Sequence, residues 1–169
     1  MEAPEAVTLD AATADDAALL FNLLELYIHD LSGVFPEVEL GADGRFGYEK
    51  LPLYWSEPER RFPFLVKRGG QVAGFALATS GSPVSPDPDT FDVAEFFVLR
   101  RHRRSGVGRV AAALLWRRLA GPWTVRVSER NVGALPFWAS AISTFTRGRA
   151  REARRADWRV YSFDSRDSF

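Results

Sequence analysis

The sequence has no cysteine and only two histidines among its 169 residues. The absence of cysteine excludes disulfides, thiolate metal ligands and a cysteine nucleophile. The two histidines, His29 and His102, lie far apart in the chain, so they provide neither a zinc-binding spacing nor a Ser-His-Asp arrangement. We therefore expect no metal site and no covalent chemistry at a thiol.

Long apolar runs and an excess of one charge are also missing. No window of the chain could span a bilayer, and the acidic start Met1–Glu5 is not followed by a signal-like apolar run. The 22 basic and 22 acidic residues give a formal net charge of zero, which argues against a general affinity for nucleic acid or anionic membranes. We expect a cytoplasmic protein. Basic residues nonetheless gather at Arg100–Arg109 and Arg147–Arg155, so local anion binding stays open.

The composition is that of a folded protein. Hydrophobic residues make up 46% of the chain and aromatic residues 13%, which is enough for a buried core. A chain of 169 residues is short for two domains, and no internal repeat or linker divides it. We therefore expect a single domain over residues 1–169.

The residue pattern changes twice near the middle of the chain. Phe91–Leu99 is apolar on both faces apart from Asp92 and Glu95, which predicts a strand buried inside a sheet. From Val107 onward, apolar residues recur at three- and four-residue spacing, which predicts an amphipathic helix that ends before Gly121. We expect a strand, a short charged loop and a helix in direct succession.

The loop between this strand and this helix suits an anion. Gly106 and Gly108 lack Cβ atoms, so the backbone can turn sharply and present its N–H groups at the positive end of the helix dipole. Arg103, Arg104 and Arg109 can add charge-assisted hydrogen bonds, or they can be solvated loop residues. We predict that a pyrophosphate binds here.

These residues carry a family resemblance. Arg103-Arg104-Ser105-Gly106-Val107-Gly108 matches R/Q-x-x-G-x-G/A, the main signature of the GNAT superfamily of acyl-CoA-dependent N-acyltransferases. Val98 stands at the customary valine position before the arginine. Asn131-x-x-Ala134-x-x-Phe137-Trp138 is similar to the superfamily's second signature, N-x-x-A-x-x-F-Y. The resemblance covers the chain from Phe62 to its end.

The resemblance implies a fold and an activity. The expected fold class is α+β, a three-layer α/β/α arrangement in which about four helices cover a mixed, mostly antiparallel sheet of about 6–7 strands. The expected activity is transfer of an acetyl group from acetyl-CoA, as cosubstrate, to a primary amine by direct attack in a ternary complex. Acetyl-CoA and the amine would be the partners, without nucleic acid, membrane or metal, and a homodimer is allowed.

The same resemblance assigns the cofactor contacts. Backbone groups of a splayed central strand would pair with the pantetheine amides, the Val98 N–H would polarise the thioester carbonyl, and Asn131 would contact the pantetheine arm or a bridging water. The expected acetyl-CoA contacts are Phe97, Val98, Leu99, Arg103, Arg104, Ser105, Gly106, Val107, Gly108, Arg109, Asn131 and Phe137.

Glu95 is the expected general base. A carboxylate in an apolar strand should have a raised pKa and can take a proton from an ammonium group directly or through water. Many family members place this glutamate where the chain has Ala94, one residue earlier. A one-residue offset reverses the face of a regular strand, and a β-bulge could restore it. Otherwise Glu95 would be the buried structural partner of an arginine.

The general acid is missing from its usual place. The tyrosine of the second signature is Trp138 here, and an indole cannot deliver a proton at useful pH. Either another tyrosine takes this role or solvent protonates the leaving thiolate. The candidates are Tyr27, Tyr48, Tyr54 and Tyr161.

The remaining elements follow from periodicity and turn residues. Helices are expected after the capping box Thr13–Asp16, around Tyr48–Trp55 and over Val132–Ser143. Tyr27, His29 and Asp30 at the end of the first of these helices are candidate acceptor contacts by the same resemblance. Further strands are expected at Val7–Leu9, Phe62–Lys67, Gln71–Thr79, Trp123–Glu129, Phe145–Thr146 and Trp158–Phe163.

Three other readings compete with a transferase. Gly106–Ala111 also fits the dinucleotide-binding pattern G-x-G-x-x-A, with Glu129 near the end of the next strand, but Arg100–Ser105 separates these glycines from their strand. A nucleic-acid module would use the two arginine clusters, without a recognisable motif. An inactive acyl-CoA sensor or scaffold would explain Trp138 and the offset of Glu95. The identity of the amine acceptor stays open in every case.

Overall fold

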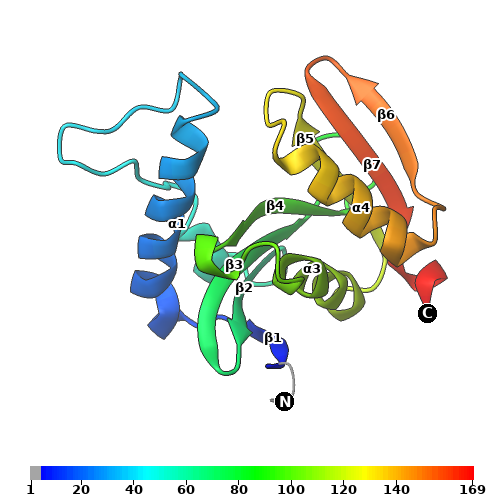
Figure 1. Ribbon diagram of the computed structural model, residues 1–169, viewed down its shortest axis with the longest axis horizontal. Helices are drawn as coiled ribbons and strands as arrows, with labels where there is room; N and C mark the ends of the chain where they lie inside the picture. The colour runs from blue at the N-terminus through cyan, green and yellow to red at the C-terminus, as the bar shows by residue number, and fades with distance from the viewer. Residues whose placement is uncertain (1–4) are drawn as a thin grey trace.

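The computed structural model describes residues 5–169, in which seven strands form one sheet in the order β1-β2-β3-β4-β5-β7-β6 (Figure 1). The start of the chain, residues 1–4, where we expected no signal-like segment, lies outside the described residues. The strands are β1 (Val7–Ala11), β2 (Arg61–Arg68), β3 (Gln71–Ser80), β4 (Phe91–Val98), β5 (Pro122–Ser128), β6 (Arg151–Arg155) and β7 (Trp158–Asp164).

Every neighbouring pair of strands is antiparallel except β4 and β5, which are parallel. The helix α3 (Val107–Arg118) makes the crossover that this one parallel pair requires. A sheet with one parallel pair is not the doubly wound parallel sheet of a dinucleotide-binding fold. The expected mixed, mostly antiparallel sheet is confirmed, and the dinucleotide-binding reading is wrong.

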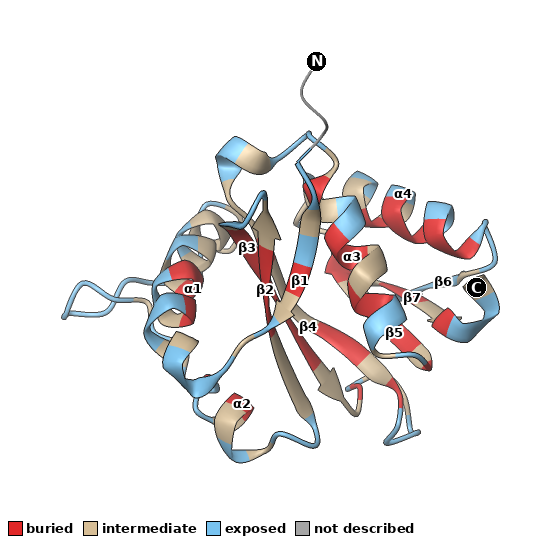
Figure 2. Ribbon diagram, turned by 90° about the horizontal axis from the view of Figure 1, so that it is seen from below, coloured by how far each residue is buried: buried red, intermediate tan, exposed pale blue. Residues whose placement is uncertain are grey.

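Four helices cover the two faces of the sheet. α1 (Ala17–Ser32) and α2 (Leu53–Ser56) lie on one face, and α3 and α4 (Ala134–Thr146) lie on the other (Figures 1 and 2). Short 3-10 turns, η1 (Ala14–Asp16), η2 (Arg100–His102) and η3 (Ser165–Ser168), precede α1, follow β4 and end the chain. The expected three-layer α/β/α fold is confirmed. None of the helices in residues 5–169 has the length and apolar character needed to cross a membrane.

Each helical layer buries its own apolar cluster against the sheet. Leu20 and Leu24 of α1 pack with Phe75 and Leu77 of β3, all fully or almost fully buried. On the other face, Trp116 of α3 belongs to a larger cluster that reaches α4 and β5. Because β4 contributes side chains to both clusters, it is the central strand that the sequence predicted.

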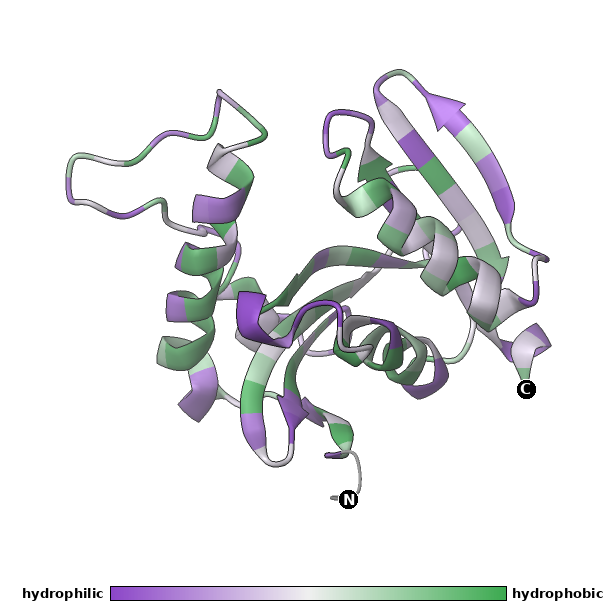
Figure 3. Cartoon of the chain, viewed as in Figure 1, coloured by the Kyte–Doolittle hydropathy of each residue, from purple (hydrophilic) through white to green (hydrophobic). Residues whose placement is uncertain are grey.

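Two sequence-based expectations need correction. Phe145–Thr146, expected to be a strand, is the last turn of α4, and the strand before β7 is Arg151–Arg155 instead. All five residues of β6 are exposed and mostly hydrophilic, as Figure 3 shows at the edge of the sheet. An edge strand of this kind has no apolar alternation to reveal it. On α3, Val110, which stands at the expected three-residue spacing from Val107, is 43% exposed, whereas Trp116, which falls outside that spacing, is fully buried.

Candidate active site

The loop between β4 and α3 forms a nest of backbone N–H groups. Arg104 (φ 58°) and Gly106 (φ 84°) both adopt the left-handed conformation, on either side of Ser105. Such reversals turn successive N–H groups toward one point, and Gly106 is also the N-cap of α3, where the helix dipole is positive. Apart from its own chain neighbours, no atom of the described residues lies within 4 Å of the place that a Cβ of Gly106 would take. The surface beside Gly106 is therefore uncovered.

Gly108 allows α3 to approach its neighbours closely. A Cβ at this position would lie 3.0 Å from the Phe137 ring of α4 and 3.6 Å from a methyl group of Val98 at the end of β4. The second glycine of the signature therefore serves packing, whereas the first serves the turn. Val107 between them is buried, and the arrangement brings both sequence signatures into contact.

Arg103 is turned toward α1. Its guanidinium pairs with Asp30 (2.6 Å), and its Nε donates to the Val98 carbonyl (2.7 Å). Partial burial acts to raise the pKa of the Asp30 carboxyl, but hydrogen bonds from Arg103 and Arg100 outweigh it, and the pKa is lowered. Arg103 therefore fastens the signature loop to α1 and β4. Arg101 and Arg104 of the loop and Arg109 at the start of α3 are exposed and form no ion pair within residues 5–169, so their guanidinium groups are open to a ligand.

β4 and β5 pair only at their first residues, Phe91 with Trp123 and Asp92 with Thr124. Further along β4, Leu99 donates its N–H to Ala73 on the β3 side (2.8 Å). Because backbone groups alternate in direction along an antiparallel strand, the N–H of Val98 points away from β3, toward the side where β5 has already diverged. The splayed strand that the resemblance implied is present.

The second signature lies at the start of α4. The Asn131 side chain accepts a hydrogen bond from the Ala134 N–H (3.3 Å), and the Phe137 ring stacks on Phe96 of β4 (6.1 Å between centroids). Trp138 is 9% exposed and packs edge-on against Phe96 (5.0 Å). The indole that replaces the family's tyrosine is therefore a core side chain.

A bulge in β4 aims Glu95 at the α1 side of the sheet. Leu77 of β3 pairs with Glu95 while the next residue, Ala78, pairs with Val93, so Ala94 is the extra residue. Ala94 and Glu95 consequently line the same cavity. The bulge absorbs the offset between this chain and the usual family position, which was one of the two outcomes left open by the sequence.

Two tyrosines hold the Glu95 carboxylate. The hydroxyl of Tyr27 (α1) donates to it at 2.7 Å and that of Tyr48 at 3.2 Å. Burial raises the pKa of Glu95 above its ordinary value, although both hydrogen bonds and the charges of Arg126 and Lys50 act to lower it. Burial and the nearby carboxylate also raise the pKa of Tyr27 and Tyr48, so both keep their protons at neutral pH.

The β4 carboxylate that pairs with an arginine is Asp92, not Glu95. The Asp92 side chain is 2% exposed and accepts two hydrogen bonds from Arg126 of β5, at 3.1 Å and 2.7 Å, and a third from Thr124 (2.8 Å). This network fixes the end of β4 at which β5 is still paired. Glu95 forms no ion pair within residues 5–169, and its carboxylate is held by the two tyrosine hydroxyls.

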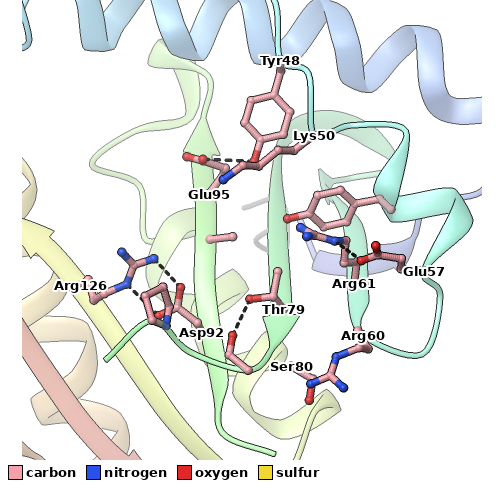
Figure 4. Close-up of a pocket in the computed structure, with 14 residues that line it drawn as sticks. Tyr48, Lys50, Glu57, Arg60, Arg61, Thr79, Ser80, Asp92, Glu95 and Arg126 are labelled. Atoms are coloured by element: carbon pink, nitrogen blue, oxygen red, sulfur yellow. Dashed lines mark hydrogen bonds and ion pairs between the residues drawn. The ribbon is translucent and has the colours of Figure 1, made fainter. Parts of the chain in front are cut away.

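A cavity of about 260 Å³ opens beside Glu95. Its walls come from β3, from the bulged part of β4, from Arg126 on β5 and from the segment Tyr48–Arg61 that leads into β2 (Figure 4). Charged and hydroxyl side chains point into it from all of these elements. The arrangement places a carboxylate with raised proton affinity in a small polar cavity, on the same strand as the open backbone edge.

Comparison with known protein families shows to which family the chain belongs. A family model described as the Acetyltransferase (GNAT) family matches residues 22–141, which run from α1 to α4 and include both signatures. The chain belongs to the GNAT acetyltransferase family. No curated protein sequence matches it.

Solved GNAT structures share the fold over nearly the whole chain. An acetyltransferase from Thermus thermophilus superimposes with a TM-score of 0.65 at 17% identity, over 94% of this chain and 96% of its own. The putative acetyltransferase yncA from Salmonella typhimurium, solved with acetyl-CoA, gives 0.64 at 14% identity, over 95% and 94%. Aminoglycoside acetyltransferase AAC(6')-Ib, solved with coenzyme A, gives 0.67 at 14% identity, over 96% of each chain. At this identity the likeness concerns the fold alone.

The GNAT fold also assembles residues that sequence reasoning did not group. Lys50 and Arg60 come from the irregular chain on either side of α2, Arg61 begins β2, and Arg126 comes from a strand far along the chain. All four nevertheless line the cavity beside Glu95. No spacing rule connects them. The one usable signal was Asp92, a second charge in an apolar strand, which required a buried cation nearby.

The three candidate acceptor contacts, Tyr27, His29 and Asp30, lie in different surroundings. Tyr27 contacts Glu95 from the core, Asp30 pairs with loop arginines, and exposed His29 packs edge-on against Phe46 (6.3 Å). None of the three lines the cavity. Tyr48 and Tyr54 line it, and Tyr161 lies on β7, outside it.

Proposed function

We propose that the protein is an acetyl-CoA-dependent N-acetyltransferase, a single domain that acetylates a primary amine by direct attack in a ternary complex. The observation that carries the proposal is the convergence on β4 of three features. These are the nest at Arg104–Gly106, the unpaired backbone edge at Val98 and the carboxylate of Glu95 in a polar cavity. A catalyst of amide formation from a thioester needs an anion site, an oxyanion donor and a base.

The residues present fit acetyl-CoA. The nest and the exposed Arg104 and Arg109 would hold the pyrophosphate, and the free backbone groups of β4 would pair with the pantetheine arm. The Val98 N–H would stabilise negative charge on the carbonyl oxygen. When bound, acetyl-CoA supplies an acetyl group activated as a thioester. Relatives of the same fold were solved with acetyl-CoA and with coenzyme A, which supports the same ligand here.

Glu95 would prepare the acceptor. An alkylamine with a pKa of about 10.4 is protonated at neutral pH and cannot attack a carbonyl carbon. A buried carboxylate with a raised pKa accepts that proton more readily than an ordinary glutamate would. The hydrogen bonds from Tyr27 and Tyr48 fix its orientation.

The proton that Glu95 takes can also serve the leaving thiolate. A thiol has a pKa of about 8.5, whereas burial raises the pKa of Tyr54 to about 12 and that of Tyr48 further still. Both tyrosines are therefore weaker acids than the thiol that they would have to protonate. We assign the return of the proton to the Glu95 carboxylic acid through water, or to solvent.

The test combines binding with turnover. Calorimetry should detect acetyl-CoA binding by the folded protein, and Gly106→Glu should abolish it, because a carboxylate on the uncovered surface beside Gly106 repels the pyrophosphate. Amines added with acetyl-CoA should release free thiol. Absence of acetyl-CoA binding, or identical ligand responses of the Gly106→Glu variant, would refute the proposal.

A non-catalytic acyl-CoA sensor is the second candidate. The observation in its favour is that Trp138, at the family's tyrosine position, lies in the core and presents no hydroxyl. A sensor would bind acetyl-CoA but release no thiol with any amine.

A further inference from the structure

The cavity beside Glu95 is lined by more basic than acidic side chains, four against three. Two of the basic groups are neutralised within the cavity wall. Arg61 pairs with Glu57 (2.8 Å), and Arg126 pairs with the buried Asp92 through two hydrogen bonds. What is left is the carboxylate of Glu95 and two cations.

These two cations, Lys50 and Arg60, lie at the border of the cavity. Neither forms an ion pair with a carboxylate anywhere in residues 5–169. Lys50 precedes α2, and the Arg60 guanidinium lies beside Gly81, 3.5 Å from the position of a Cβ there, on the far side of the cavity from Tyr48 (Figure 4). Lys50 extends toward Glu95 from the Tyr48 side of the cavity, and its charge acts on that carboxylate (Figure 4). An acceptor ammonium at Glu95 would therefore leave Arg60, on the other side, as the cavity cation without a counter-charge.

Tyr54 adds an independent indication of a ligand. Its side chain is 2% exposed and lines the cavity, and its hydroxyl makes no hydrogen bond of ordinary geometry within residues 5–169, although Tyr48 and Arg61 lie beside it. A buried hydroxyl without a partner carries a free-energy cost, so such groups are normally satisfied. An oxygen atom of a ligand in the cavity would satisfy it.

We infer that the acceptor is a small amine that carries an anionic group, a carboxylate or a phosphate, with its amino group at Glu95 and its anion held by Arg60 and the Tyr54 hydroxyl. The inference rests on the proposed function and narrows its substrate class. Polyamines and aminoglycosides are excluded as good acceptors, because a further ammonium group would face Arg60 with like charge.

Matched acceptors test the charge requirement. Thiol release from acetyl-CoA is measured with ω-amino carboxylates from glycine to 6-aminohexanoate, each against its own carboxamide, and with phosphoethanolamine against ethanolamine. The anionic member of at least one pair should have the higher kcat/KM, by about tenfold or more, since charge-assisted hydrogen bonds are lost in the neutral member. The two kinds of pair distinguish carboxylate from phosphate recognition. Neutral amines or spermidine reacting as well as every anionic amine would overturn the inference.

A substitution assigns the effect to Arg60. Arg60→Gln should bring the anionic-to-neutral ratio close to one. Arg45→Gln, which removes an exposed arginine outside the cavity, should leave the ratio unchanged. An unchanged ratio in Arg60→Gln would also overturn the inference.

A binding measurement separates this inference from the proposed function. Calorimetry in the presence of coenzyme A compares the N-acetylated carboxylates with the corresponding N-acetylated carboxamides. Preferential binding of the carboxylates without any thiol release would refute the transferase and support the anion site. Thiol release with equal binding and equal rates for both members would support the transferase and refute the anion site.

Discussion

At the scale of single residues, the proposed function depends most on Glu95. Glu95→Gln keeps an oxygen that can accept the hydrogen bonds of Tyr27 and Tyr48 but removes the base. We expect kcat/KM to fall by about 100-fold or more, with acetyl-CoA binding unchanged. In the wild type kcat/KM should rise with pH through the raised pKa of Glu95. A variant with wild-type turnover would contradict the assignment.

The same substitution, which should lower activity, should raise stability relative to the wild type as pH rises. Because burial raises the pKa of Glu95 above 4.5 in the folded protein, folding favours the protonated carboxyl. Its stabilising contribution is present below the unfolded-state pKa and is lost as pH rises through the folded-state pKa. Glutamine does not ionise. The unfolding free energy of Glu95→Gln minus that of the wild type should therefore increase between about pH 4 and about pH 8. Urea unfolding at both pH values measures this difference, and a constant difference would show that Glu95 is not desolvated.

Tyr48 tunes this carboxylate. Its hydrogen bond to Glu95 acts to lower the pKa of the carboxyl, so Tyr48→Phe should raise that pKa and move the acidic limb of the kcat/KM profile to higher pH. Tyr161→Phe is the matched control, since that hydroxyl lies on β7 outside the cavity and forms no hydrogen bond to Glu95. Equal profiles for the two variants would rule out this role of Tyr48.

At the scale of elements, β4 packs against both helical layers through its two faces and presents unpaired backbone groups along its one free edge. Glu95 and Phe97 face α1, whereas Phe96 and Val98 face α3 and α4, and the bulge at Ala94 lets the strand change register between them. The signature loop is then held between α1, through Arg103 and Asp30, and α4, through Gly108 and Phe137. Acetyl-CoA affinity should therefore depend on packing as well as on charge.

Two glycine substitutions separate the packing contact at Gly108 from the general effect of adding a Cβ. Gly108→Ala places a Cβ 3.0 Å from the Phe137 ring, so we expect a loss of about 1–3 kcal/mol in stability and weaker acetyl-CoA binding as α3 and α4 separate. Gly133→Ala, at the N-cap of α4, puts a Cβ into open space at φ −75° and should change stability by less than about 0.5 kcal/mol. Thermal unfolding and calorimetry of both variants measure these effects. A similar loss in both would show that the Gly108 contact is not the cause.

At the scale of the whole molecule, local patterns predicted the part of the site that local backbone builds. The strand, the nest and the helix follow one another in the chain, so the residue patterns of Phe91–Leu99 and Arg103–Gly108 were enough to predict them. The cavity walls could not be predicted in the same way, because Lys50, Arg60 and Arg126 meet only through the sheet order. The bulge that aims Glu95 depends on pairing with β3, which no pattern within β4 specifies.

The long segment between α1 and α2 is fastened at two points that also belong to this scale. Near its end, the Glu25 carboxylate of α1 accepts the N–H groups of Phe46 and Gly47. Near its start, Glu37 pairs with Arg130 in the turn between β5 and α4, one residue before Asn131 (3.2 Å for one of the two bonds). The Glu37–Arg130 contact joins the segment between α1 and α2 to the turn that carries the second signature.

Breaking this contact should affect motion more than stability. The pair is exposed, so Arg130→Glu should change the free energy of unfolding little. The amide hydrogens of residues 33–40 should nevertheless exchange faster, because like charges push the segment away. The double change Glu37→Arg with Arg130→Glu restores opposite charges and should restore slow exchange, as followed by mass spectrometry. Because the segment leads directly to Tyr48 and Lys50 at the cavity, acceptor kcat/KM should fall and recover in parallel with the exchange rates. Exchange that is unaffected by the single change would mean that Glu25 alone holds the segment in place.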